Sequence, residues 1–158
     1  ITKNFLPADQ YNFIKTKLHS DMFPWYWNDH SVKPNSQPQF THTFYDKCFR
    51  RSDHLPLLEP IINILNPLAI FRIKVNCNPQ TSSIIETGMH QDLKDERFIS
   101  SVLFLDTCDG YLRLKNSDLI NSEDNKLVTF KSNIEHTGST TTNAKRRIVL
   151  SIIYLPTL

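Results

Sequence analysis

The sequence predicts one mainly β domain, an antiparallel barrel or sandwich with helices packed on one outer face. Apolar residues recur at helical spacing twice before Pro67, and after it the spacing changes to two. Turn segments such as "DTCDG" and "NSEDN" then separate short apolar runs. The 158 residues suit a single domain with one core, divided into a helical support region over 1–68 and a β core over 69–158.

Two helices are expected in the support region. Residues 6–19 contain Pro7 and Asp9, which favour a helix start, followed by a periodic apolar stripe. Residues 55–66 repeat the helical spacing and end at Pro67. The stripe of the first helix consists of Phe13, Ile14 and Leu18, and that of the second of Leu55, Leu58, Ile61, Ile62 and Leu65.

Strands are expected where apolar and polar residues alternate. In "AIFRIKVNCNP" (69–79), one face is apolar and the other is polar. Further strands are expected over 40–46, 97–105, 110–115, 126–130 and 146–155, and "FPWYW" (23–27) is strand-like. The polar face of 69–79 carries Arg72, Lys74, Asn76 and Asn78. Alternation does not decide whether that face looks into the barrel or into solvent.

Charge and cysteine content restrict the partners and the compartment. The 18 basic and 16 acidic residues are interspersed, which argues against nucleic acid as an obligatory partner. Three widely spaced cysteines without a CxxC pair favour a reducing, cytoplasmic compartment. The sequence has no signal-peptide pattern and no apolar run of about 18 residues, so no membrane span is predicted.

The stretch "TGMHQDLKD" (87–95) places His90 and Asp92 one residue apart between two expected strands. His136 in "SNIEHTG" follows the run "KLVTF" and is a third candidate ligand. Two histidines and one carboxylate suit a ferrous ion, because they leave one side of the metal open for substrate and O₂. Each part alone is weak, since a lone histidine at a strand end is more often a surface or capping residue.

The last expected strand adds an arginine and a serine. Arg147 and Ser151 point the same way on an extended strand, and together they can hold a carboxylate. The alternative is that "KRR" (145–147) is a charged turn before an apolar strand. The order H-x-D, strands, His and then Arg-x-x-x-Ser is more specific than any of its parts.

In that order, the chain from Ile70 to Tyr154 resembles the iron(II)/2-oxoglutarate-dependent oxygenases of the prolyl-hydroxylase-like group. The pieces that carry the resemblance are "FRIKVNCNP", "HQD", "SVLFLDTCDGYLRL", "KLVTFKSNIEH" and "RRIVLSIIY". The resemblance implies a double-stranded β-helix, or jelly roll, with 69–158 as its catalytic core. It also implies Fe(II) as cofactor, 2-oxoglutarate as co-substrate and O₂ as oxidant, with a small molecule or a peptide side chain, such as prolyl, as substrate.

The resemblance also assigns roles to residues. His90, Asp92 and His136 would bind Fe(II), Arg147 would pair with the distal carboxylate of 2-oxoglutarate, and Ser151 would hydrogen-bond it. Relatives often carry a co-substrate-binding tyrosine where this chain has Phe104. Either Arg147 and Ser151 suffice, or a polar residue of the neighbouring strand contributes. The candidates for that contribution are Lys74, Asn76 and Asn78.

Two rival functions use the same fold class. One is a cupin-like metal protein with these ligands and no 2-oxoglutarate, and the other is a non-catalytic jelly-roll binding module. Neither needs a pair of carboxylate-binding residues such as Arg147 and Ser151.

Three further features have two possible interpretations each. Trp25, Tyr26 and Trp27 either flank an entrance or belong to the core, and the segment 28–39 is either a lid or a surface loop. Tyr111 and Arg113 face either inward or outward.

Overall fold

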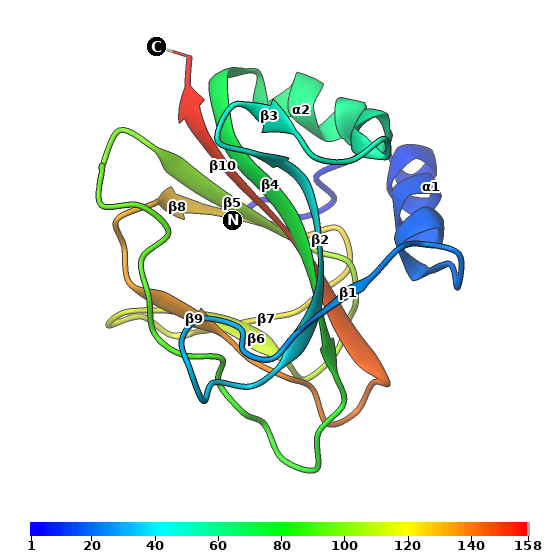
Figure 1. Cartoon of the computed structure of the whole chain (residues 1–158), viewed down its shortest axis with the longest axis vertical. Coiled ribbons are helices and arrows are strands. Elements are labelled where there is room, and N and C mark those ends of the chain that lie inside the picture. The colour runs from blue at the N-terminus through cyan, green and yellow to red at the C-terminus, as the bar shows by residue number, and fades with distance from the viewer. Residues whose placement is uncertain (158) are drawn as a thin grey trace.

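The computed structural model describes residues 1–157, in which two antiparallel sheets face each other and the helices lie outside the larger one (Figure 1). The larger sheet has the order β1-β2-β4-β10-β5-β8, with β3 beside β2, and the smaller has the order β7-β6-β9. The strands of the larger sheet are β1 (Tyr26–Asn28), β2 (Gln39–Asp46), β3 (Phe49–Arg50), β4 (Pro67–Pro79), β10 (Arg146–Pro156), β5 (Ile99–Phe104) and β8 (Leu127–Lys131). The smaller sheet consists of β7 (Leu119–Asn121), β6 (Tyr111–Leu114) and β9 (His136–Gly138). The predicted mainly β fold is confirmed.

Helix α1 (Ala8–His19) packs on the outer face of the larger sheet. Its buried residues are Tyr11, Ile14 and Leu18, which lie three and four positions apart and therefore share one side of the helix. Phe13 was expected in this stripe but is 57% exposed. The reason is the helical step of about 100°, which turns position 13 away from the side occupied by Ile14.

The second expected helix is divided into a short 3₁₀ turn, η1 (Leu55–Leu58), and helix α2 (Glu59–Leu65). Pro56 and Pro60 are the second residues of the two segments and lie in their first turns, where a missing backbone N–H costs no helical hydrogen bond. Asn66 then ends α2 in the left-handed conformation. Leu58 and Ile61 are fully buried against the larger sheet, so this segment covers the sheet beside α1.

Strand β4 separates the apolar packing from the polar interior. Ile73 and Val75 are fully buried in the cluster beneath the helices, and Cys77 lies with them. The alternating residues therefore project from the opposite face, toward the smaller sheet. A smaller apolar cluster lies between the two sheets, formed by Val102, Phe104, Leu112, Val128, Phe130 and Val149.

Two strands of the smaller sheet, β7 and β9, are absent from the sequence-based expectations. Each has three residues, too few for alternation to be recognised. In the support region, the strand expected over 40–46 is confirmed as β2, and β1 and β2 extend the larger sheet next to β4. The sheet thus joins both parts of the chain by direct pairing.

Cys48, Cys77 and Cys108 are free thiols. Among residues 1–157, no helix combines the length and the apolar character needed to cross a bilayer.

Replacement of Leu18 by alanine should lower the free energy of unfolding by about 2–5 kcal/mol, because a fully buried leucine leaves a cavity between α1 and the sheet. Urea denaturation measures this change. Phe13→Ala on the same helix is the matched control, and we expect a change within about 0.5 kcal/mol for this exposed side chain. Equal losses in the two variants would contradict the packing described for α1.

Candidate metal and co-substrate site

A cavity of about 90 Å³ opens between the two sheets. At roughly 10–15 Å³ for each water-sized group, it has room for about six to nine such groups, which is comparable with a small dicarboxylic acid. Eight of the nine site residues expected from the sequence line it: His90, Asp92, His136, Arg147, Ser151, Lys74, Asn76 and Asn78. The structure therefore brings together residues that are up to 77 positions apart.

Backbone pairing brings the two histidines side by side. The amide N–H of His90 donates to the carbonyl oxygen of His136 at 2.9 Å, and the reverse bond measures 2.8 Å. This isolated antiparallel bridge joins the loop before β5 to the first residue of β9. The imidazole centroids are consequently 4.4 Å apart.

Both imidazoles present the same nitrogen to a common centre. His90 Nδ1 lies 3.0 Å from the Gly88 carbonyl oxygen, and His136 Nδ1 lies 3.0 Å from that of Ile134. A carbonyl oxygen only accepts, so each Nδ1 carries a proton, and Nε2 is the nitrogen through which each ring can bind a metal. Burial lowers the pKa of His136, which favours the neutral imidazole that binds metals. Gly88 has φ of +113°, a conformation that side chains disfavour.

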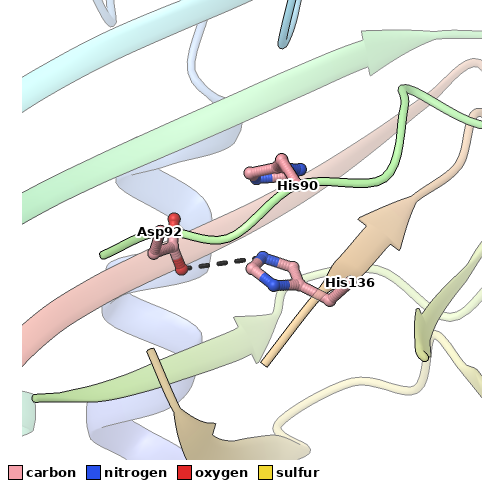
Figure 2. Close-up of side chains that lie close together, drawn as sticks. All are labelled: His90, Asp92 and His136. Atoms are coloured by element: carbon pink, nitrogen blue, oxygen red, sulfur yellow. Dashed lines mark ion pairs between the residues drawn. The ribbon is translucent and has the colours of Figure 1, made fainter. Parts of the chain in front are cut away.

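Asp92 is held by two side chains and its own backbone. Arg72 Nη2 donates to Asp92 Oδ1 at 2.9 Å, and Ser100 Oγ donates to Oδ2 at 2.7 Å. The Asp92 amide donates to the carbonyl of Ser132 at 3.1 Å. Oδ2 also lies 3.6 Å from His136 Nε2, and Figure 2 shows this contact with His90 beside it.

These three side chains fit a metal ion. One ligand atom from each of His90, Asp92 and His136 lies within 4.8 Å of the others. Two imidazoles and a carboxylate converge here, and together they form a donor set that a cation stabilises. Neighbouring ligands of a metal at about 2.1 Å lie about 3 Å apart, so small side-chain rotations complete the site. Two histidines and one carboxylate on one side are the donor set of non-haem Fe(II) oxygenases.

Arg147 lies on the wall of the same cavity and is only 2% exposed. Its Nε donates to Ser122 Oγ at 2.7 Å and its Nη1 donates to the Ser139 carbonyl at 3.1 Å. Burial lowers its pKa to about 10, so the guanidinium stays protonated at neutral pH. Within residues 1–157, no carboxylate forms an ion pair with it. A buried cation without a partner is costly, and a carboxylate ligand would relieve that cost.

Phe104 and Gly110 shape the space around Arg147. The Phe104 ring centroid lies 5.4 Å from Arg147 Cζ, which is cation–π distance, and Phe104 is not part of the cavity wall. A Cβ added to Gly110 would come within 2.4 Å of Arg147 Cδ and 2.7 Å of the Thr140 carbonyl oxygen. The absence of a side chain at Gly110 thus leaves the space through which the Arg147 side chain extends toward the smaller sheet.

The polar face of β4 looks into the cavity, which decides the alternative that the sequence left open. Asn78, Asn76 and Lys74 are paired in register with Arg147, Val149 and Ser151 of β10, respectively. Asn78 Nδ2 donates to Gln39 Oε1 at 3.3 Å, whereas Asn76 Oδ1 is buried without a hydrogen-bond partner. An unpartnered buried amide oxygen on the wall is a contact point for a ligand donor.

Other residues considered from the sequence take different positions. Tyr111 and Arg113 both bond to Glu86 and are not part of the cavity wall. Trp25 packs against the core, while Tyr26 and Trp27 are 61% and 53% exposed. Ser31 and Val32 of the loop 28–39 line the cavity, and Ser31 Oγ donates to the Thr87 carbonyl at 3.1 Å.

Sequence reasoning missed the residues that position the expected ones. Ser100, Ser122 and Gly110 contact Asp92 or Arg147 from strands or turns elsewhere in the chain. Ser100 offered one signal, because it is a polar residue in the apolar run "RFISSVLFL". Ser122 and Gly110 lie in turn-like segments, where serine and glycine need no special explanation.

Solved structures with the same fold were found over nearly the whole chain. A 2-oxoglutarate–Fe(II) oxygenase family oxidoreductase from Burkholderia pseudomallei superposes with a TM-score of 0.69 at 16% identity, covering 98% of this chain and 83% of that one. A prolyl-4-hydroxylase from Pseudomonas putida gives 0.67 at 15% identity, covering 99% and 91%. A prolyl hydroxylase from Trichoplax adhaerens, in complex with a peptide fragment of the hypoxia-inducible factor, gives 0.68 at 15% identity, covering 98% and 82%.

The comparisons define the class of fold, which is that of the 2-oxoglutarate–Fe(II) oxygenases, a jelly roll. An α-ketoglutarate-dependent epimerase from nogalamycin biosynthesis shares it, with a TM-score of 0.65 at 11% identity, over 98% of this chain and 76% of that one. No family model and no curated protein matched the sequence. The fold is therefore compatible with more than one reaction.

Ser100→Ala should weaken metal binding about 10- to 100-fold, because Asp92 loses a hydrogen bond that orients it. Titration of the purified protein with Fe(II) under anaerobic conditions measures the dissociation constant. Ser101→Ala is the matched control, since Ser101 is equally buried but bonds to Thr129 and Tyr154 instead. The same loss of affinity in both variants would show that Ser100 acts on the strand and not on Asp92.

Proposed function

We propose that this protein is an Fe(II)- and 2-oxoglutarate-dependent dioxygenase that hydroxylates its substrate. The observation that carries the proposal is that a buried arginine without a carboxylate partner faces the same cavity as a two-histidine, one-carboxylate cluster. A dicarboxylic acid can bridge these two groups, one end at the metal and the other at Arg147. The fold shared with the oxygenases supports this interpretation.

Each residue of the cluster has a defined task in this proposal. His90, Asp92 and His136 would hold Fe(II) through one atom each and leave the side toward the cavity open. The backbone bridge between the two histidines fixes their separation, while Arg72 and Ser100 fix the carboxylate. Bound iron, 2-oxoglutarate and O₂ would supply the oxidising chemistry, with succinate and CO₂ as the products of the co-substrate.

Arg147 would bind the distal carboxylate of 2-oxoglutarate by a charge-assisted hydrogen bond. Phe104, at the position where relatives often have a tyrosine, lies at cation–π distance from the guanidinium and would help to hold it in place. Ser151 lines the same wall and would donate its hydroxyl to that carboxylate, while Asn76 also lines the wall and Asn78 lies directly beside Arg147 in the sheet. These residues would orient the co-substrate and exclude water from it.

A peptide side chain, prolyl or another, is one proposed substrate class, and a small molecule is the other. The peptide class is supported by the complex of the Trichoplax adhaerens prolyl hydroxylase with a peptide. The cavity volume of about 90 Å³ is comparable with that of the co-substrate, so most of the substrate would lie outside it.

Two rival functions make different predictions about Arg147. A cupin-like metal protein that uses no 2-oxoglutarate has no need for a buried arginine at this distance from the metal ligands. A non-catalytic jelly-roll module has no need for the converging lone pairs of His90, Asp92 and His136 either. The presence of both features beside one cavity favours the dioxygenase.

Anaerobic addition of Fe(II) and 2-oxoglutarate should produce a visible charge-transfer band, because the co-substrate would chelate the metal. His136→Ala should abolish metal binding and the band, because one of the three proposed ligands is lost. The circular dichroism spectrum should stay unchanged, because His136 is the first residue of the short strand β9. His54→Ala removes an exposed histidine far from the cavity wall and is the control. A folded, iron-loaded wild type without a band would refute the dioxygenase proposal.

Arg147→Ala should raise the dissociation constant of 2-oxoglutarate about 10- to 150-fold, which corresponds to a charged hydrogen bond of about 1.5–3 kcal/mol. Titration of the charge-transfer band provides the measurement. Arg146→Ala removes the same charge from the adjacent position, where the side chain donates to the His19 carbonyl at 2.9 Å on the other face. We expect that control to bind 2-oxoglutarate normally, and normal binding by Arg147→Ala would refute the carboxylate assignment.

A further inference from the structure

Lys74 is a largely buried cation on the cavity wall without a partner of its own. It lies on β4 opposite Thr43 of β2 and Ser151 of β10. Within residues 1–157, no hydrogen bond or ion pair reaches its ammonium group, which is influenced only by burial and by more distant charges. Its side chain lines the cavity together with the metal-ligand candidates. The ammonium group is therefore available to a ligand.

The neighbouring cations are already engaged or lie elsewhere. Arg72, two residues away on the same face of β4, forms the ion pair with Asp92 at 2.9 Å. Arg147 is opposite Asn78, four residues along β4 from Lys74, which is about 13 Å on an extended strand. Lys74 thus lies toward the Arg72 end of the cavity, away from the arginine proposed for the co-substrate.

The charges on the cavity wall do not balance. Three cations, Arg72, Lys74 and Arg147, face one carboxylate, Asp92, which leaves two surplus positive charges. Fe(II) would add two positive charges and 2-oxoglutarate two negative ones, so loading the site leaves this surplus unchanged. Asp46 is the next acidic group that acts on Lys74, and it does not line the cavity. A surplus of one sign in a site shielded from water attracts a ligand of the other sign.

Keeping a lysine here works against the fold. Burial, together with the Arg72 charge, lowers the pKa of Lys74 to about 8 from its ordinary value of 10.5. The packing of β4 depends on its other face, through Ile73 and Val75, so an apolar residue at 74 would serve stability better. A costly group without structural partners is typical of a functional site.

We propose that Lys74 binds the substrate and that the substrate carries an anionic group, a carboxylate or a phosphate. The inference rests on the dioxygenase proposal for the chemistry, but the anion site itself depends only on Lys74. The ammonium would hold the anionic group at the metal end of the cavity, so that an adjacent carbon of the substrate faces the open side of the metal.

The first test asks whether Lys74 has a structural role. Lys74→Met keeps the length of the side chain and removes its charge, and we expect it to raise the melting temperature of the protein at pH 7. Lys74→Arg keeps the charge and should melt near the wild-type temperature or below it. A lower melting temperature for Lys74→Met would show that the ammonium stabilises the fold, and it would overturn the proposal.

The second test measures anion binding with small probes. Acetate and methyl phosphate should each raise the melting temperature of the wild type in a saturable way, at concentrations where acetamide has no effect. Lys74→Met should need at least tenfold more of either anion, whereas Lys74→Arg should respond like the wild type. The more effective anion distinguishes a carboxylate from a phosphate substrate. No response of the wild type, or an equal response of Lys74→Met, would overturn the proposal.

A third measurement separates substrate from co-substrate. Lys74→Met should bind 2-oxoglutarate within about twofold of the wild type when the charge-transfer band is titrated. An increase as large as that expected for Arg147→Ala would mean that Lys74 contacts 2-oxoglutarate, and the proposal would be wrong. If no variant shows a band, the dioxygenase proposal fails, and the melting experiments, which need no metal, decide the anion site independently.

Discussion

The antiparallel exchange of two backbone hydrogen bonds between positions 90 and 136 is the constraint on which the candidate site depends. It ties the long connection between β4 and β5 to the start of β9, so that loop and strand behave as one unit at this point. The side chains then need only short-range support, since carbonyl groups two residues away accept from both imidazoles. The separation and orientation of the two imidazoles are thus fixed by hydrogen bonds to main-chain atoms, and these bonds depend little on which side chains lie nearby.

The larger sheet divides stability and chemistry between its two faces. Its outer face buries aliphatic residues of β4 and β10 beneath α1 and α2, where apolar burial provides most of the folding free energy. Its inner face carries Arg147, Lys74 and Asn76, each with an unmet electrostatic or hydrogen-bonding requirement. Such requirements cost stability in the free protein and become favourable contacts when a ligand of matching charge is present.

The sequence predicted the elements with long, regular patterns and the residues with distinctive chemistry. Alternation over 69–79 and helical spacing over 6–19 correspond to β4 and α1, and the nearness of His90, Asp92 and His136 agrees with the expected metal triad. The three-residue strands β7 and β9 were not predicted, because alternation cannot be recognised over so few residues. Which face of β4 lines the cavity was not predicted either, because both faces of a strand can be covered in a jelly roll. Residues such as Ser100 act through contacts made only after folding, which no local pattern records.

Gly110 has a wider consequence for how this chain can vary. Because even a methyl group there would overlap the aliphatic part of Arg147 and a carbonyl oxygen, the turn before β6 and Arg147 are sterically linked across 37 positions of sequence. A larger residue at position 110 would therefore require a different path for the Arg147 side chain. Searches for distant homologues, and attempts to graft this cavity onto another jelly roll, should therefore consider positions 110 and 147 together.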